Sequence, residues 1–171
     1  MPALATEPKI NLIRPTDDEA RQLARDLIRA ARFGALATLE RGTGFPVATR
    51  VALATDTDGT PVTLVSRLSN HTANILADPR ASLLIGEPGK GDPLTHPRVT
   101  LFTQAREVAR GGEAHARLRD RFLAANPKAK LYVDFGDFLF VALDIERASL
   151  NGGFGKAYEL TREDVLGQAR E

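Results

Sequence analysis

The stretch SRLSNHTANILADPRASLLI, residues 66–85, places a polar segment between two apolar runs. The run that leads into it, PVTLVS, and the run at its end, ASLLIG, have the length and composition of β-strands. Between them, NHTANILAD is long enough for about two helical turns before Pro79 ends the helix. The stretch therefore predicts a strand, a short polar loop, a helix and a second strand.

Strand-like runs continue on both sides of this stretch. GALATLE and FPVATRVALAT precede it, and RVTLFTQAREV and GDFLFVALDIERASL follow it, the last of these being typical of a long, mostly buried strand. DTDG at 56–59 is expected to form a hairpin turn, because Asp and Gly tolerate the positive φ of tight turns. The sequence thus predicts six strands, of which the first three should form a meander.

Helices are predicted near both ends of the chain and in its second half. Thr16 and Glu19 form a capping-box pair, and small and apolar residues recur at helical spacing from there to Ala31. GEAHARLRDRFLAANP, residues 112–127, offers a second apolar helix face, and TREDVLGQAR should form a terminal helix capped at Thr161. EPGKGDPLTHP and NGGFGK are expected to be loops.

The order of these elements favours one α+β domain that is mainly β. The strands do not alternate with helices, so a mainly antiparallel sheet is expected, and closing six short strands into a barrel would remove exposed edges. A chain of 171 residues has the size of one domain. Residues 1–14 contain Pro2 and Pro8 and are predicted to be an extended arm, with the folded domain at 15–171.

Composition excludes several classes of function. The 23 Lys and Arg residues balance 22 Asp and Glu residues, so a nucleic-acid partner is not expected. The chain has no Cys, and its three His residues lack a metal-ligand spacing, so no metal site is expected. No apolar run approaches the ~18 residues of a membrane helix, and the N-terminus lacks a secretory pattern. These features predict a cytoplasmic protein with no membrane contact.

The polar part of the opening stretch has the chemistry of an anion site. A strand that ends at Arg67 and a helix that starts near His71 would aim backbone N–H groups and a guanidinium at one place, which suits phosphate. Arg50, in the apolar strand ATRVALA, would add a second positive charge. The alternative is that Ser69 or Asn70 only caps the helix, with His71 and Asn74 exposed. In that case Arg67 would pair with Asp78, and Arg50 would face solvent.

From Phe33 to Lys156 the chain resembles the FMN-binding split barrels related to pyridoxamine 5′-phosphate oxidase. Within this superfamily it is most similar to the haem-utilisation proteins, which share the pattern S-x-L-x-x-H-T-x-N-L-x-x-D-P-R-x-S-L-L and a later GGFG. Ile75 stands at one Leu of that pattern. The resemblance implies a six-stranded antiparallel split β-barrel with flanking helices, and a homodimer that holds FMN at the subunit interface.

The resemblance also implies a set of FMN-binding residues. Arg50, Ser66, Arg67, His71 and Thr72 would hold the phosphate and ribityl chain, and Asn74 would support them. The backbone around Val51, Ala52 and Val65 would face the flavin ring. Arg98 and Gln104 are candidates for contacts across the dimer, and Lys156 follows a double Gly suited to closing over a ligand. From the residues alone, Gln104 fits a solvent-facing strand position equally well, and NGGFGK fits a tight turn.

The implied function is that of an FMN-dependent oxidoreductase acting on an unspecified small molecule, with the flavin carrying the electron chemistry. No residue is assigned as catalytic, because none is an obvious general base. A non-catalytic module that stores or senses flavin or haem is the alternative. The chain stops at Glu171, without the C-terminal domain of the larger haem-handling relatives, and it lacks the basic substrate-phosphate set of the vitamin-phosphate oxidases. Neither iron ligation through such a domain nor vitamin-phosphate oxidation is therefore expected.

Overall fold

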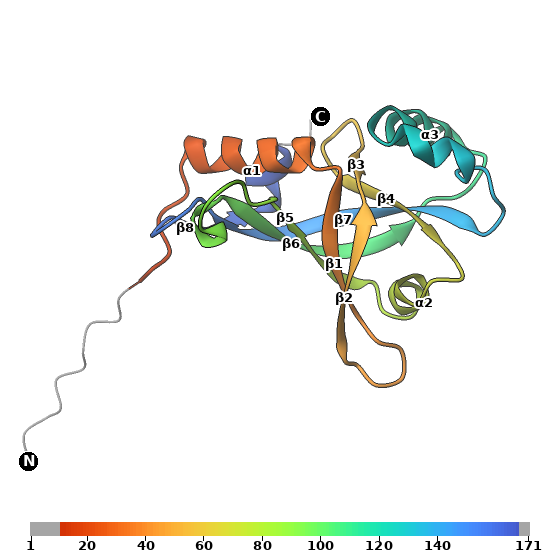
Figure 1. Ribbon diagram of the computed structural model, residues 1–171, viewed down its shortest axis with the longest axis horizontal. Helices are drawn as coiled ribbons and strands as arrows, with labels where there is room; N and C mark the ends of the chain where they lie inside the picture. The colour runs from red at the N-terminus through yellow and green to blue at the C-terminus, as the bar shows by residue number, and fades with distance from the viewer. Residues whose placement is uncertain (1–10, 168–171) are drawn as a thin grey trace, which may run out of the picture.

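An antiparallel sheet of eight strands lies at the centre of the protein (Figure 1). This count refers to residues 11–167, which the computed structural model describes. The strands are β1 (Phe33–Leu39), β2 (Pro46–Ala52), β3 (Ala54–Thr55), β4 (Pro61–Ser66), β5 (Arg80–Ile85), β6 (Arg98–Glu107), β7 (Phe138–Asn151) and β8 (Ala157–Thr161). The helices are α1 (Asp18–Ala30), α2 (Asn70–Ala77), α3 (Glu113–Ala125) and α4 (Arg162–Leu166), with short 3-10 helices η1 (Pro93–Thr95) and η2 (Pro127–Leu131).

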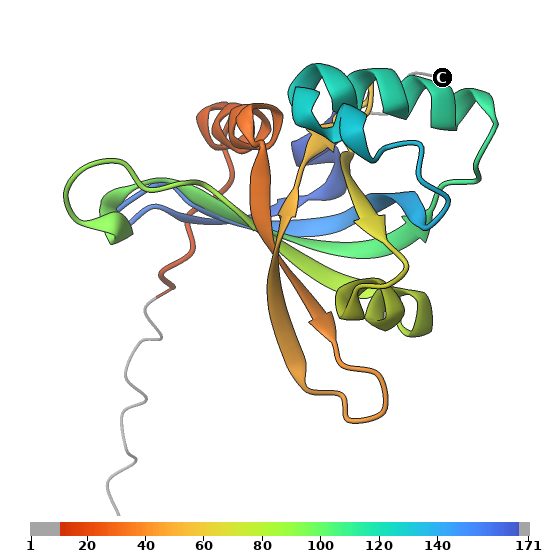
Figure 2. The ribbon, with the colours of Figure 1, turned by 45° about the vertical axis from the view of Figure 1, so that its right-hand side comes forward.

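The sheet curls back on itself. Its strand order is β2-β1-β5-β6-β7-β4-β3, and β8 pairs with β7. The strands at the two ends of this order, β2 and β3, are joined through Leu53 alone, so the first and last strands meet. In Figure 2, α1 and α3 lie along the upper side of the curled sheet and α2 lies at its lower right.

The sequence prediction of a mainly β fold with flanking helices is confirmed, but the predicted number of six strands is wrong. FPVATRVALAT divides into β2 and β3, because Leu53 is almost fully buried and its backbone N–H donates to the Arg32 carbonyl oxygen at 2.8 Å. The other addition is β8, which lies between the NGGFGK turn and α4 and pairs with the end of β7.

Alternating side chains divide the sheet into an inner and an outer face. Leu36, Leu83 and Leu101 lie side by side on β1, β5 and β6 and are fully buried in the inner core. Their neighbours along each strand therefore point outward. A second core forms where α3 covers the outer side of β4 and β7, with the Phe122 and Phe140 ring centroids 5.7 Å apart.

The N-cap of the first helix lies one residue later than predicted. Asp17 is the N-cap of α1, and its carboxylate accepts a hydrogen bond from the Ala20 N–H at 2.8 Å. The Thr16 hydroxyl instead donates to the Glu159 carbonyl oxygen on β8 at 2.9 Å. The predicted capping box with Glu19 is therefore wrong, because the unpredicted strand β8 provides a partner for Thr16.

The other predicted elements are present. The turn at 56–59 closes with a hydrogen bond from the Gly59 N–H to the Asp56 carbonyl oxygen at 3.0 Å, and Thr161 caps α4 in a capping box with Asp164. Residues 1–10 of the predicted arm lie outside the described residues. At its described end, Ile13 forms a parallel bridge to Ala157, and the division into an arm and a domain stays a prediction. Within residues 11–167, no helix is both long and apolar enough to cross a membrane.

Candidate functional site

The β4–α2 junction, residues 66–74, has the predicted form of a strand, a loop and a helix start. Strand β4 ends at Ser66 and α2 starts at Asn70. Ser69 occupies the N-cap position, but its side chain makes no capping hydrogen bond. The Ser69 side chain therefore does not cap the helix, contrary to the alternative interpretation of the sequence.

Acidic residues engage the first two side chains of the junction. The Ser66 hydroxyl donates to the Asp137 carboxylate at 2.6 Å and accepts from the Leu68 N–H at 3.1 Å. The Arg67 guanidinium forms an ion pair with Glu107, and its backbone N–H donates to the Asp137 carbonyl oxygen at 2.7 Å. Both side chains therefore already have partners inside the chain.

Two buried polar residues of α2 tie the helix to the sheet. The Thr72 hydroxyl donates to the Ser66 carbonyl oxygen at 2.6 Å. The Asn74 side-chain amide donates to the Thr38 hydroxyl at 3.1 Å and accepts from the Arg41 N–H at 3.1 Å. Buried polar groups require such partners, so Thr72 and Asn74 have a structural role whether or not a ligand binds.

His71 is half-buried at the start of α2. Burial lowers the pKa of its imidazole below the ordinary value of 6.5, because the charged form loses hydration. The ring is therefore mainly neutral at pH 7. It can offer one hydrogen-bond donor and one acceptor at the junction, but not the positive charge that would attract an anion.

A cavity, which we call the Arg50 groove, lies between four elements: the C-terminal end of α1, the start of β1, strand β2 and the end of β5. Its volume is about 720 Å³. The Arg50 guanidinium carbon lies 5.7 Å from the centroid of the Phe33 ring, within cation–π distance. The Arg50 guanidinium forms no hydrogen bond or ion pair with any residue in 11–167. The groove walls are mainly apolar and include Leu27, Ala30, Ala31, Phe33, Ala35, Leu84 and Pro88, with Arg32 and Glu87 as the other charged residues.

The three residues predicted to face a flavin ring have different surroundings. The side chains of Val51 and Val65 belong to the inner core. Ala52 packs against the second core, and its carbonyl oxygen accepts a hydrogen bond from the Thr63 hydroxyl at 2.8 Å. Only their backbone can contribute to a ligand site, as the resemblance implies.

The remaining predicted contacts line neither the junction nor the groove. Arg98 donates to the carbonyl oxygens of Leu94 and His96 at 3.1 and 3.2 Å, which anchors η1. Gln104 donates to Glu146 at 3.0 Å and lines a separate cavity of about 350 Å³. Lys156 is exposed at the end of the turn formed by residues 151–156, directly before β8.

Six of the predicted residues therefore fall into two groups within one chain, and Arg50 alone belongs to the groove. Five of them gather at the β4–α2 junction: Ser66, Arg67, His71, Thr72 and Asn74. None of these five lines the Arg50 groove. Within residues 11–167, no group of three His, Cys, Asp or Glu side chains is placed to hold a metal ion.

Sequence reasoning missed the partners that define each group. Asp137 and Glu107 engage the junction from positions 71 and 40 residues away along the chain. Phe33 and Leu84 line the groove, and each is more than two-fifths exposed. Their places at outward positions of β1 and β5 become visible only once the register of the two strands is known.

The chain belongs to a β-barrel family described as CREG, beta-barrel, which matches residues 15–166. It is 34% identical over 155 residues to the non-canonical heme oxygenase HOZ, chloroplastic, of Arabidopsis thaliana, covering 86% of this chain and 46% of that protein. The structure of a heme binding protein from Mycobacterium smegmatis shares 35% identity with a TM-score of 0.78, over 89% of this chain and 60% of that one. The chain thus spans about half the length of the curated relative that it matches.

A more distant structure, a FAD-binding protein from Mesorhizobium loti, shares the fold. Its identity is 21% and its TM-score 0.60, over 73% of this chain and 87% of that one. The similarity to haem-handling proteins that the sequence predicts is confirmed at the level of the family and its relatives.

Proposed function

We propose that the protein binds a planar cofactor that carries an anionic group, either haem or FMN, in the Arg50 groove. The observation that carries this proposal is the exposed Arg50 guanidinium, held against the Phe33 ring in a groove with apolar walls. Ligand sites commonly combine such walls with a few polar groups that fix orientation. Arg50 would pair with a haem propionate or with the FMN phosphate, since its fork matches both anions.

The groove fits this class of cofactor better than the β4–α2 junction does. The side chains of Ser66, Arg67, Thr72 and Asn74 are already hydrogen-bonded or paired within the chain. A phosphate at the junction would have to displace these partners, whereas Arg50 has none to lose.

Haem and FMN each have support. The relatives at 34% and 35% identity are named for haem, and the sequence resemblance to the split barrels implies FMN. In both cases we propose a homodimer, because the groove is open in a single chain and a second copy would cover it.

For the FMN-bound protein we propose an oxidoreductase that acts on a small molecule. The flavin would supply the electron transfer, and the chain would bind and orient it. The charged groups that line the groove are Arg32, Arg50 and Glu87, and of these only Glu87 carries hydrogen-bond acceptors on its side chain. This sparse set equally favours the second candidate, a module that stores haem or flavin without turnover.

The binding experiment titrates the purified protein separately with hemin and with FMN and follows the absorption spectrum. We expect saturable binding of at least one of them, with Arg50→Gln weakening it roughly tenfold to a hundredfold, the loss that fits one charge-assisted contact. Arg14→Gln is the matched control, because Arg14 is an exposed arginine that does not line the groove. Equal affinities in wild type and Arg50→Gln would contradict the groove assignment.

Turnover is tested on the FMN-loaded protein under anaerobic conditions. NADH or NADPH is added, the flavin absorbance is followed, and an electron acceptor is then supplied. Bleaching followed by reoxidation supports the oxidoreductase. A flavin that stays oxidised with both nucleotides would leave the binding module as the function.

A further inference from the structure

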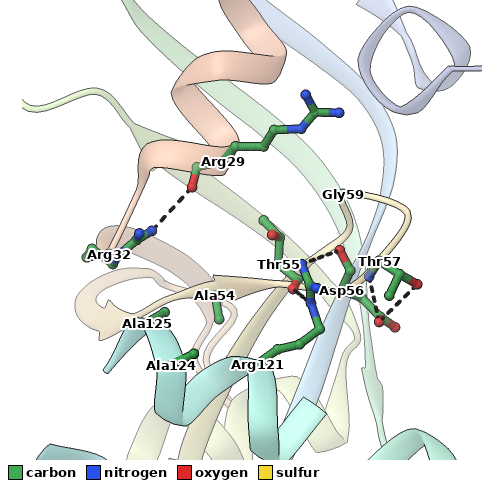
Figure 3. Close-up of a pocket in the computed structure, with 10 residues that line it drawn as sticks. All are labelled: Arg29, Arg32, Ala54, Thr55, Asp56, Thr57, Gly59, Arg121, Ala124 and Ala125. Atoms are coloured by element: carbon green, nitrogen blue, oxygen red, sulfur yellow. Dashed lines mark hydrogen bonds between the residues drawn. The ribbon is translucent and has the colours of Figure 1, made fainter. Parts of the chain in front are cut away.

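A second cavity, which we call the arginine pocket, lies between α1, β3, the hairpin turn at 56–59 and α3 (Figure 3). Its volume is about 440 Å³. Arg29 and Arg32 approach it from the end of α1, and Arg121 approaches it from α3. It shares only Arg32 with the Arg50 groove, so its ligand does not depend on the cofactor proposed above.

The three arginine side chains differ in how many of their N–H donors already have a hydrogen-bond partner. Arg121 donates through Nε to the Thr55 carbonyl oxygen at 2.6 Å, which lays its guanidinium along β3. Arg32 donates through Nη1 to the carbonyl oxygens of residues 29–31 at 3.2–3.5 Å and so completes the end of α1. The Arg29 guanidinium has no hydrogen bond or ion pair with any residue in 11–167, and the side chain extends across the top of the pocket in Figure 3.

The acidic group in the pocket does not neutralise these charges. The Asp56 carboxylate accepts two hydrogen bonds from Arg117, at 2.8 and 3.0 Å, and one from the Thr57 N–H at 2.7 Å. Arg117 itself is not part of the pocket lining. Asp56 is therefore committed to a fourth arginine, and the three pocket guanidinium groups keep their charge.

The helix ends at the pocket reduce the positive potential but do not reverse it. Both α1 and α3 end there, and a helix C-terminus carries roughly half a negative charge. The two ends together offset about one of three positive charges. The remaining excess favours an anion with several oxygens, because a guanidinium fork can bind two of them at once.

We infer that the arginine pocket binds a phosphate-bearing small molecule, with Arg29 as its main unpaired contact and Arg32 and Arg121 contributing their free N–H groups. The cavity volume lies in the range of small-molecule sites and leaves space beside the phosphate for the rest of the ligand. Thr55 and Thr57 line the pocket beside these charges and are able to hydrogen-bond that remainder.

Isothermal titration calorimetry with pyrophosphate tests this site in the full chain at low salt. We expect saturable binding in wild type, weakened roughly tenfold by Arg29→Gln, since one charge-assisted contact is lost. Arg29→Lys keeps the charge without the fork and should bind with intermediate affinity. Arg119→Gln is the control. Arg119 is on α3, as Arg121 is, but it pairs with Asp134 and lies outside the pocket.

ADP and inorganic phosphate serve as further probes. Tighter binding of ADP than of pyrophosphate supports a phosphorylated organic ligand. Binding of pyrophosphate and inorganic phosphate without ADP would overturn that class. An Arg29→Gln protein that binds pyrophosphate as wild type does, or equal weakening by Arg119→Gln, would overturn the site itself. Because the Arg29 guanidinium makes no hydrogen bond or ion pair within residues 11–167, its variants should unfold close to the wild-type temperature.

Discussion

Asn74 joins α2 to β1 and to the turn that follows it, through one hydrogen bond each, in a buried position where 4% of the residue is exposed. Removing its side chain leaves the Thr38 hydroxyl without a partner, and Thr38 is also buried. We therefore expect Asn74→Ala to lower the free energy of unfolding by about 2 kcal/mol, the cost of unsatisfied buried polar groups. Urea unfolding followed by circular dichroism measures this change.

Asn70→Ala provides the comparison, because Asn70 is exposed at the first position of the same helix. Its unfolding midpoint should stay close to that of wild type. An Asn74→Ala protein that is as stable as wild type but binds hemin or FMN more weakly would show that Asn74 serves the ligand rather than the fold.

At the scale of elements, β1 packs closely against its neighbour β5 at Gly34. A Cβ atom placed on Gly34 would lie 2.9 Å from the Leu84 carbonyl oxygen and 3.0 Å from the Leu83 side chain. Because backbone cannot yield as a flexible side chain can, Gly34→Ala should push the two strands apart. We expect a loss of about 1–3 kcal/mol in the free energy of unfolding, measured by urea denaturation.

Gly136→Ala tests whether this loss comes from crowding. Gly136 has no atom within 4 Å of an added Cβ, so its variant should unfold as wild type does. Gly34 also lines the Arg50 groove, so the displaced strands should weaken hemin or FMN binding as well. A fully stable Gly34→Ala protein would contradict the close approach of β1 to β5.

The sequence allows prediction of those elements whose signals are local. Strand alternation and the polar loop at 66–74 predict β4, α2 and β5, because each pattern lies within its own element. Strand β8 has the same alternation, with Tyr158 and Leu160 buried and Glu159 exposed, but the neighbouring turn and helix signals obscure it. The break between β2 and β3 at Leu53 is not visible in the sequence, because the apolar pattern continues through it. The curl of the sheet imposes this break.

The candidate site is predictable only in part for the same reason. The donors at the β4–α2 junction can be identified from the sequence, because they lie within nine consecutive residues. Their engagement by Asp137 and Glu107 depends on contacts between distant segments, so the sequence does not reveal that these donors are already occupied. The groove combines residues of α1, β1, β2 and β5, and it becomes visible only in the assembled fold.

At the scale of the whole molecule, the outer face of β1, β2 and β5 combines small and apolar side chains. Ala35 and Ala37 on β1 point outward beside the exposed Ala48 on β2, and Phe33 and Leu84 are 43% and 44% exposed. Such a face lets another backbone approach closely, and it borders the Arg50 groove. It is therefore the surface through which we expect two copies of the chain to associate.

Light scattering coupled to size exclusion should give wild type the mass of two chains. Ala48→Glu would place a carboxylate in the apolar contact, where desolvation is costly, and should shift the mass to that of one 18.5 kDa chain without lowering the melting temperature of the fold. Ala116→Glu, at an exposed position of α3, should stay dimeric. If the second copy completes the Arg50 groove, Ala48→Glu should also weaken hemin or FMN binding, whereas a monomer with wild-type affinity would show that one chain forms the whole site. A wild-type protein with the mass of one chain would contradict the proposed dimer.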